Sequence, residues 1–544
     1  MPLNHHFSAQ VLVVGAGPVG ITLAMDLAGR GVDVLVAETR ARGEAPSPKC
    51  NHVSARTMEI FRRLGVVRAV REAGLPADYP NDISFRTTAV GREFARIPIP
   101  CRRDRYTATG GADTWWPTAE PPHRINQIFL EPILVDRAAR LPRLRLLNRA
   151  RVEEFAQDET GVRARAVSLD DGRAITVSAA YMVGCDGGQS MVRRAIGARF
   201  EGDAEIGRTQ TSYIRAPSLL RRMTAAPAWS NQCFNPRRSA NIFAVDGRET
   251  WLVHNYLRPG EEFAGVDRDA CLRAILGGDI PFEVLSHEDW VGRRLLANRF
   301  RDRRVFICGD AAHIWVPFGG YGMNAGIADA TTLAWQLAGA LQGWAGPRVL
   351  DAYEAERRPI TEQVSRHAMN TAMALARQRA AVPDNIEAEG PEADATRAAF
   401  GAELLRINTP QFCCGGLNFG AYFEDSPLVV GDGEKAPPYT MDQFTQSTVP
   451  GCRLPHVFLP DGTSLYDRLG GWFTLLRCDP GADAAPIEEA ARVRGVPLRT
   501  LDMPRIAPYA HALVLSRPDQ HIAWRGNAPP RDALALIDRV RGAA

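Results

Sequence analysis

The stretch GAGPVG at residues 15–20 constrains the fold of this chain more than any other feature. An apolar, β-branched run at 10–14 precedes it, a helical pattern at 21–30 follows, and a second apolar run occupies 32–37. Gly31 ends the helical pattern, as glycine often does. A strand, a glycine turn, a helix and a second strand form a βαβ unit, in which GxGxxG is typical of dinucleotide binding.

Each residue of this turn has a predicted role. Gly15 allows the tight turn, Gly17 lets the backbone approach a pyrophosphate, and Gly20 lets the helix pack against the strand. Pro18 lies within the turn and belongs to the same predicted cofactor site. Glu38 ends the second strand, where its carboxylate can accept a hydrogen bond from a ribose hydroxyl. A glycine turn that is merely structural is the alternative.

Composition excludes several classes of protein. A chain of 544 residues is too long for a single core and indicates two or three domains. Hydrophobic residues make up 45% and charged residues 23%, as in globular proteins. The net charge of +3, without a basic run, predicts neither a nucleic-acid nor a membrane partner. No secretory segment and no run of 18 apolar residues is visible, so we expect a cytoplasmic protein.

The ten cysteines show neither a CxxC pair nor a Cys/His spacing typical of metal sites. We therefore predict no metal, and interpret the cysteines as mostly buried thiols in a reducing compartment. The adjacent Cys413 and Cys414 are interpreted as packed residues rather than a redox pair.

Two further segments exceed the needs of a simple dehydrogenase. YMVGCDGGQSMVRRAIG at 181–197 and RVFICGDAAH at 304–313 are apolar runs that break into Asp-Gly and Gly-Asp, and the glycine-rich VPFGGYGMNAG follows at 316–326. With GAGPVG, this set resembles the single-component FAD-dependent aromatic hydroxylases over nearly the whole chain. That group includes p-hydroxybenzoate hydroxylase, and the closer resemblance is to the phenol and chlorophenol hydroxylases.

The resemblance implies a set of FAD contacts on matching positions. The glycines of the turn would cradle the pyrophosphate, and Pro317 would help to leave a space over the flavin ring. Main-chain amides of the glycine-rich loop would meet the pyrimidine edge of the flavin. The remaining implied contacts are Glu38 on the adenosine ribose, Lys49 near the pyrophosphate, Gln127 on the flavin side, Asp186 in an Asp-Gly motif linked to FAD and NAD(P)H, Asp310 on the ribityl chain, and the loop amides around Gly322, Met323 and Asn324.

The resemblance also implies an α/β fold of three parts. These are a Rossmann-like FAD-binding domain, a β-sheet substrate domain inserted in it, and a C-terminal thioredoxin-like domain. The corresponding ranges are 1–80, 121–200 and 295–382 for the first, 81–120 and 201–294 for the second, and 440–544 for the third, with 383–439 as a linker region. Because the last domain lacks CxxC, we expect it to be structural.

The implied reaction is hydroxylation of a phenolic substrate with NADH or NADPH and O2, through a flavin C4a-hydroperoxide. Such an electrophilic attack needs an electron-rich ring, usually prepared by a base that removes the phenol proton. His254 and Tyr256 on one strand face, His52 and Asp113 are the candidate bases, and each also has a structural interpretation. Epoxidation or ring oxidation on the same scaffold, or a non-catalytic protein that binds flavin and an aromatic ligand, remain open, as does a homodimer.

Overall fold

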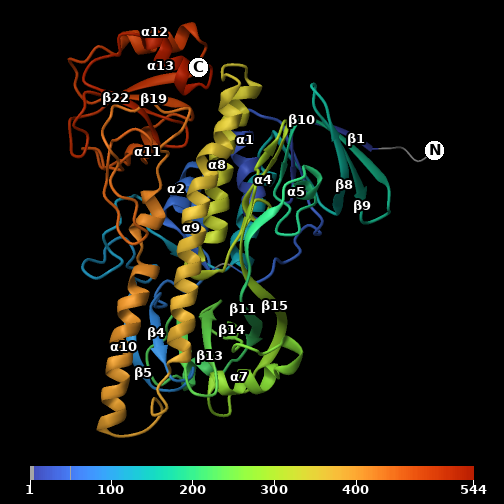
Figure 1. Ribbon diagram of the computed structural model, residues 1–544, viewed down its shortest axis with the longest axis vertical. Helices are drawn as coiled ribbons and strands as arrows, with labels where there is room; N and C mark the ends of the chain where they lie inside the picture. Colours follow the sequence, from blue (N-terminus) through green and yellow to red (C-terminus); the bar gives the residue numbers. More distant parts are fainter. Residues whose placement is uncertain (1–4, 50) are drawn as a thin grey trace.

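The computed structural model describes residues 5–49 and 51–544. Its main sheets lie in three regions of an elongated body, with two long helices running beside them (Figure 1). The expected α/β class with an inserted sheet and a C-terminal α/β unit is confirmed.

The first sheet carries the GAGPVG turn. Its strands run in the order β16-β17-β10-β1-β2-β7, and the five from β17 to β7 are parallel. The antiparallel β9 and β8 continue from β10. The bounds are β1 (His5–Val14), β2 (Val34–Ala37), β7 (Leu144–Leu147), β8 (Ala150–Gln157), β9 (Val162–Ser168), β10 (Ala174–Gly184), β16 (Arg301–Asp302) and β17 (Val305–Ile307).

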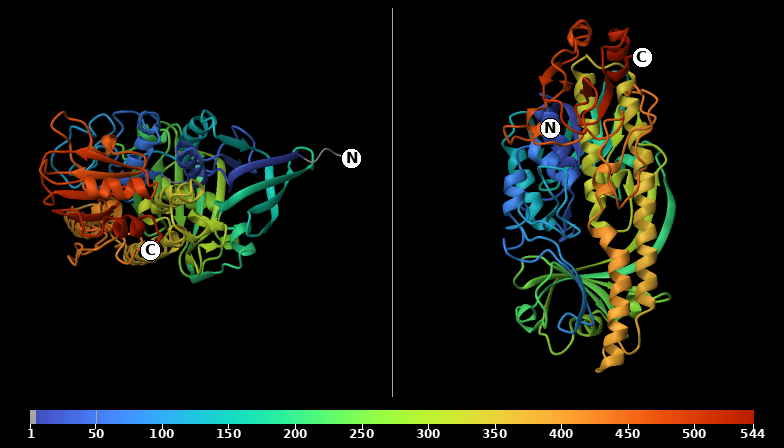
Figure 2. Two further views of the ribbon diagram at one scale, coloured as in Figure 1. Left: turned by 90° about the horizontal axis from the view of Figure 1, so that it is seen from above. Right: turned by 90° about the vertical axis from the view of Figure 1, so that its left-hand side faces the viewer.

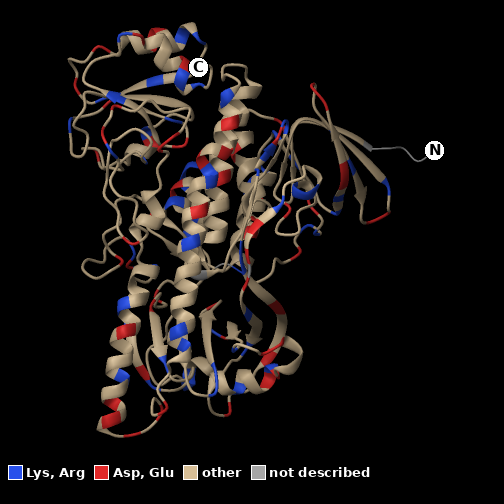
Figure 3. Cartoon of the chain, in the orientation of Figure 1, with Lys and Arg blue, Asp and Glu red and all other residues tan. Residues whose placement is uncertain are grey.

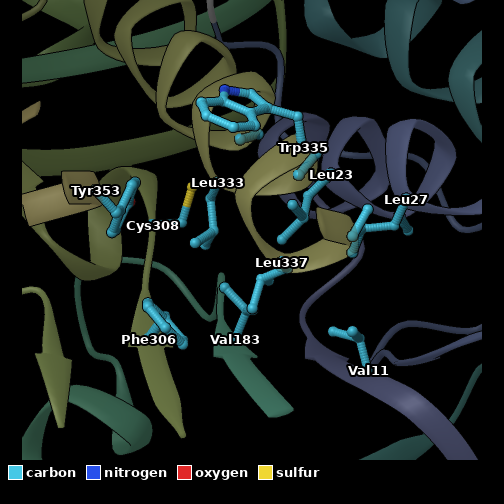
Figure 4. Close-up of a cluster of buried hydrophobic side chains, with 14 of the residues drawn as sticks. Val11, Leu23, Leu27, Val183, Phe306, Cys308, Leu333, Trp335, Leu337 and Tyr353 are labelled. Carbon is cyan, nitrogen blue, oxygen red and sulfur yellow. The ribbon is translucent and has the colours of Figure 1, made fainter. Parts of the chain in front are cut away.

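Helices α1 (Pro18–Gly29) and α8 (Tyr321–Leu341) pack together and onto this sheet. Leu23, Leu333 and Leu337 of these helices are fully buried and lie in one cluster with strand residues such as Val183 (Figure 4). Fully burying one such side chain stabilises the fold by about 1.5–3 kcal/mol. The other helices of this region are α2 (Ala55–Arg63), α3 (Val67–Glu72), α4 (Gln127–Ala139) and α5 (Met191–Ala195).

The second sheet has the order β18-β15-β11-β14-β13-β12-β4-β5, in which only β12 and β4 pair in parallel. Apolar residues of one face pack on α7 in a separate core. The bounds are β4 (Ile83–Arg86), β5 (Glu93–Ile97), β11 (Phe200–Arg215), β12 (Ser230–Phe234), β13 (Ser239–Ala244), β14 (Thr250–Tyr256), β15 (Glu283–Ala297), β18 (His313–Ile314), α6 (Leu219–Arg222) and α7 (Arg268–Leu276).

Two long helices, α9 (Arg348–Ala380) and α10 (Pro391–Phe412), pass beside the second sheet (Figure 2, right). The expected linker region at 383–439 is therefore wrong for residues 391–412, which are helical. Pro391 at the first helical position, with Glu392 and Asp394 in the first turn, is typical of a helix start, which the polar composition concealed. A Cβ on Gly401 would lie 2.7 Å from the Phe94 carbonyl oxygen, so α10 contacts β5 closely.

The C-terminal sheet has the order β20-β19-β21-β22. A parallel β19-α12-β20 unit is followed by the β21-β22 hairpin and α13, which is the connectivity of a thioredoxin-like core. The bounds are α11 (Leu465–Arg468), β19 (Phe473–Arg477), α12 (Ala485–Val493), β20 (Leu498–Asp502), β21 (Leu513–Ser516), β22 (Ile522–Gly526) and α13 (Ala533–Val540).

Charged residues of both signs alternate along α9, α10 and the loops, without a long run of one sign (Figure 3). Among the described residues, no helix is both long and apolar enough to span a bilayer. The nine described cysteines are free thiols, eight of them buried; Cys50 lies outside the described residues.

Candidate active site

The three glycines of the GAGPVG turn have different surroundings. A Cβ on Gly15 would lie 2.4 Å from the Cys185 carbonyl oxygen, and one on Gly20 would lie 2.1 Å from the Gly15 oxygen, so both positions need glycine for the fold itself. A Cβ on Gly17 would meet no protein atom within 4 Å. Open space therefore lies beside Gly17, at the N-terminus of α1, where backbone N–H groups and the helix dipole favour a phosphate.

Glu38 closes the turn from the end of β2. Its Oε2 accepts a hydrogen bond from the Ala16 N–H at 2.7 Å, and its Oε1 accepts one from the Arg40 N–H at 2.8 Å. Oε1 also accepts from Thr39 Oγ1 at 3.2 Å and from Arg40 Nε at 3.4 Å. Oε2 has only the Ala16 contact, so it keeps an acceptor position for a ribose hydroxyl. The position of Glu38 therefore fits its predicted contact with the adenosine ribose.

Lys49 and Gln127 are neighbours at the start of α4, because the Gln127 N–H donates to the Lys49 carbonyl oxygen at 3.0 Å. The Lys49 ammonium binds Glu288 Oε1 on β15 at 2.8 Å, and both side chains are about half exposed. The Gln127 side chain donates to Glu131, which also binds Arg40 at 2.8 Å. Both predicted residues thus lie on the flavin-domain side of the junction with the second sheet.

The Asp186 carboxylate has protein partners. Oδ1 accepts from Ser190 Oγ at 2.5 Å, while Oδ2 accepts from the Met191 and Val192 N–H groups at 2.7 and 3.2 Å. It therefore satisfies the N-terminus of α5. The Asp-Gly motif positions this turn through hydrogen bonds that the sequence motif alone did not reveal.

Asp310 lies in the turn Gly309–Ala311 that follows β17. Its side chain keeps exposed surface, although burial by the surrounding protein raises the pKa of the carboxyl. The carboxylate is therefore accessible, and its contact with the ribityl chain stays a prediction.

A buried ion cluster, which sequence reasoning missed, holds the turn Gly309–Ala311 in place. Asp329 on α8 binds His313 Nε2 at 2.5 Å and accepts from Arg357 Nε on α9 at 2.7 Å. Burial raises the pKa of Asp329, but the charges of His313 and Arg357 outweigh it and lower the pKa to about 2. The only sequence signal was the polarity of Asp329 within the apolar helical pattern at 326–341.

The predicted loop amides around Gly322, Met323 and Asn324 belong to the first turn of α8, so the expected loop is instead a helix start. Asn324 Oδ1 accepts from the Ser54 N–H at 2.9 Å, and its Nδ2 donates to the His52 carbonyl oxygen at 3.1 Å. A Cβ on Gly322 would meet no protein atom within 4 Å. The first N–H groups of a helix lack intrahelical partners, so this turn is an anion-stabilising end held beside an open space.

Pro317 precedes a left-handed backbone step. Gly319 has φ +76° and Gly320 has φ +68°, and a Cβ on Gly320 would lie 2.9 Å from His52 Cβ. His52 Nδ1 lies 3.1 Å from the Gly319 carbonyl oxygen, so it donates there. Burial and the Arg124 charge lower the pKa of His52, which places a neutral histidine against this loop.

Asp113 does not present an open carboxylate. Its Oδ2 binds Arg105 at 2.6 Å and its Oδ1 accepts from Trp116 Nε1 at 2.7 Å, with both charged side chains buried. The arrangement favours the structural interpretation of this residue.

His254 and Tyr256 share one face of β14, as expected. Thr211 Oγ1 on β11 lies 2.7 Å from His254 Nδ1 and accepts from Trp290 Nε1 at 2.8 Å. Burial and the Arg379 charge lower the pKa of His254 to about 4, so the ring is neutral near pH 7. The Arg379 guanidinium on α9 lies 3.5 Å from the Tyr256 ring centroid, and burial raises the pKa of Tyr256, which disfavours it as a base.

A run of rings, which we call the aromatic face, follows the same side of the sheet. Trp229, Phe243, His254 and Trp290 have successive centroid distances of 5.1, 5.5 and 6.2 Å. Gln232 and Asn241 continue the row of His254 across β12 and β13. Within the described part of the chain, the buried Gln232 Oε1 has no hydrogen-bond partner. Sequence reasoning gave only a generic aromatic content for this region.

Comparison with known proteins identifies the family of this chain. Residues 8–368 match the family described as FAD binding domain, and residues 447–544 match the one described as aromatic-ring hydroxylase, C-terminal. The chain belongs to the FAD-dependent aromatic-ring hydroxylases. These hydroxylases are flavoprotein monooxygenases, so FAD is the cofactor that the glycine turn, Glu38 and the start of α8 fit.

Similar proteins span nearly all of this hydroxylase. FAD-dependent monooxygenase apdD of Emericella nidulans is 31% identical, with 97% of this chain and 89% of that protein covered. Phenol 2-monooxygenase of Pseudomonas sp. strain EST1001 is 30% identical, with 98% and 92% covered. The structure of chromopyrrolic acid-soaked RebC with bound 7-carboxy-K252c has a TM-score of 0.90 at 34% identity, covering 99% of this chain and all of that one.

Proposed function

We propose that this hydroxylase acts on a phenolic aromatic substrate that lies against the aromatic face, with NAD(P)H as reductant and O2 as oxidant. One oxygen atom forms the new C–O bond and the other leaves as water, with two electrons from NAD(P)H. The aromatic face is the observation that carries the proposal, because flat rings stack on such a surface while Gln232 and Asn241 offer polar groups to substrate oxygens. Phenol 2-monooxygenase and the RebC complex support the aromatic class.

The aromatic face connects to the flavin end of the site through a chain of contacts. The Arg124 guanidinium lies 4.3 Å from the Trp229 ring centroid, and Arg124 is the register partner of His52 in the β3 (His52–Val53) and β6 (His123–Arg124) ladder. The His52 ring contacts the Tyr321 ring at 6.0 Å, at the start of α8. A substrate on the aromatic face would thus be adjacent to the helix end assigned to the flavin.

Bound FAD supplies electron transfer from NAD(P)H and activation of O2. The first turn of α8 would offer its unpaired backbone N–H groups to negative charge on the bound cofactor. A substrate stacked on the aromatic face would shield the reacting centre from bulk water, which would favour oxygen transfer over loss of the oxidant.

His254 acts as a hydrogen-bond donor in this proposal. Thr211 accepts from Trp290, and its own proton has His254 Nδ1 as acceptor, so the neutral ring carries its proton on Nε2. That tautomer satisfies all three groups. We therefore propose that His254 orients a substrate oxygen and does not remove the phenol proton.

The test measures NAD(P)H oxidation by the FAD-loaded protein over a panel of phenols. We expect phenols that bind to accelerate oxidation. His254→Leu should lower kcat/KM about 10- to 100-fold for such a phenol, while His254→Gln, which keeps a donor, should lose less. If the protein binds FAD but no phenol accelerates its oxidation of NAD(P)H, the result would favour the non-catalytic alternative.

A further inference from the structure

Arg124 is a buried cation that lacks an anionic partner. The residue is 4% exposed. Within residues 5–49 and 51–544, no carboxylate lies within 4.0 Å of its guanidinium, and none of its N–H groups has a hydrogen-bond partner. Buried charges are normally paired, because an unpaired one has lost its hydration without compensation. The exception requires an explanation.

Asp113 is not the missing partner. It is the acid whose charge acts on Arg124, but its two oxygens are held by Arg105 at 2.6 Å and by Trp116 at 2.7 Å. The Asp113 and Arg105 pair is nearly neutral as a unit, so Arg124 remains the uncompensated charge of this region.

The position of Arg124 indicates what could supply the counter-charge. Its guanidinium stacks on Trp229, the first ring of the aromatic face, and its register partner His52 contacts Tyr321 at the start of α8. Stacking fixes the plane of the guanidinium, while its N–H groups point outward from the edge of that plane. Such a fork is suited to bind an oxyanion.

We propose that Arg124 binds an anionic oxygen of the aromatic substrate, either a carboxylate or a phenolate. The inference rests on the proposed function and deepens it, because it names the charge of the substrate. For a phenol, the O–H bond breaks, the proton goes to water and the electron pair stays on the oxygen beside the guanidinium. Arg124 thus makes a dedicated base unnecessary, which agrees with the donor role of His254.

The first experiment separates binding from folding. Arg124→Met removes the charge and keeps a long apolar side chain on Trp229. Arg145→Met is the control, because Arg145 also stacks on a ring, that of Phe7 at 5.9 Å, but belongs to β7 at the edge of the first sheet. In the FAD-loaded proteins, we expect Arg124→Met to change Tm by no more than about 2 °C, because no ion pair is lost.

The second experiment uses three probes on the same samples. Naphthalene-2-carboxylate should bind wild type at least tenfold more tightly than Arg124→Met, and naphthalene-2-carboxamide should bind both alike. 4-Nitrophenol, whose anion is yellow, should ionise on wild type at least one pH unit lower than on Arg124→Met. The carboxylate and nitrophenol results distinguish the two kinds of anion.

The proposal is overturned if the wild-type protein binds naphthalene-2-carboxylate no more tightly than naphthalene-2-carboxamide and also does not promote ionisation of 4-nitrophenol. It is also overturned if Arg124→Met binds all three probes as wild type does, or if its Tm falls by many degrees while Arg145→Met is unaffected. FAD content and O2-dependent product are measured in parallel. Probe binding without any oxygenated product would contradict the proposed function and leave the role of Arg124 intact.

Discussion

The Arg517 guanidinium holds both carboxylate oxygens of Glu356, 161 positions away, at 2.6 and 2.8 Å. Neither side chain is exposed, and Arg517 also binds Asp519 Oδ2 at 2.7 Å. Glu356 lies on α9 and Arg517 directly follows β21, so one buried ion cluster joins the C-terminal sheet to the helix that borders the site. The two parts therefore fold as coupled units.

Loss of Arg517 should destabilise the protein strongly. Arg517→Met leaves two buried carboxylates without their cation, which costs about 3–5 kcal/mol of unfolding free energy. Arg477→Met is the control, because the Arg477 and Asp502 pair is solvent-exposed and contributes at most about 1 kcal/mol. Urea unfolding at neutral pH measures the free energy of unfolding of both variants. Equal losses in the two variants would contradict the coupling of the C-terminal sheet to α9.

Two glycines of the same turn should respond differently to alanine. Gly17→Ala adds a Cβ that meets no protein atom, so the apoprotein should keep its Tm while FAD affinity falls at least tenfold. Gly20→Ala forces a Cβ to within 2.1 Å of the Gly15 oxygen and should lower the Tm of the apoprotein itself. Thermal unfolding of the flavin-free protein measures the effect on stability, and titration with FAD measures the effect on affinity. Unchanged FAD affinity in Gly17→Ala would argue that the pyrophosphate lies elsewhere.

The buried His254 should make stability depend on pH. Its pKa is about 4 in the folded protein against about 6.5 in an unfolded chain. Between these values the unfolded state binds more protons, so the free energy of unfolding falls as pH falls from 6.5 toward 4. His254→Gln should flatten this slope, whereas His287→Gln, at an exposed position on β15, should not. An unchanged slope in His254→Gln would mean that the histidine is not held neutral.

Cys452 and Cys478 should have no redox role. Both are buried, and burial raises the pKa of each thiol to about 11, which suppresses the reactive thiolate. Replacing both by serine should leave phenol-dependent turnover within about twofold of wild type. A fall of tenfold or more with unchanged Tm would show that a thiol takes part in turnover.

The flavin motifs could be predicted because each depends on local sequence. The strand, glycine turn and helix around Gly17 follow from adjacent residues, and Glu38 follows from its distance along the chain. The fold class and cofactor were confirmed. The domain ranges and the contacts of individual residues with FAD stay predictions.

Features that depend on distant partners could not be predicted. The Asp113 carboxylate is held by Arg105 and Trp116, and His254 Nδ1 lies within hydrogen-bond distance of Thr211 on another strand. The unpaired state of Arg124 is visible only when every neighbour is placed. Helix α10 was missed because its start is as polar as a loop, although Pro391 carried the correct signal.

Oxygen transfer to the substrate is tested most directly with isotopically labelled O2. The FAD-loaded protein is supplied with NADPH or NADH, 18O2 and a phenol that accelerates NAD(P)H oxidation. The mass of the product is then measured by mass spectrometry. We predict a product that has gained one 18O atom, with one NAD(P)H consumed for each product formed. Consumption of NAD(P)H that yields only hydrogen peroxide, with no labelled aromatic product from any phenol, would contradict the assignment of this site to aromatic hydroxylation.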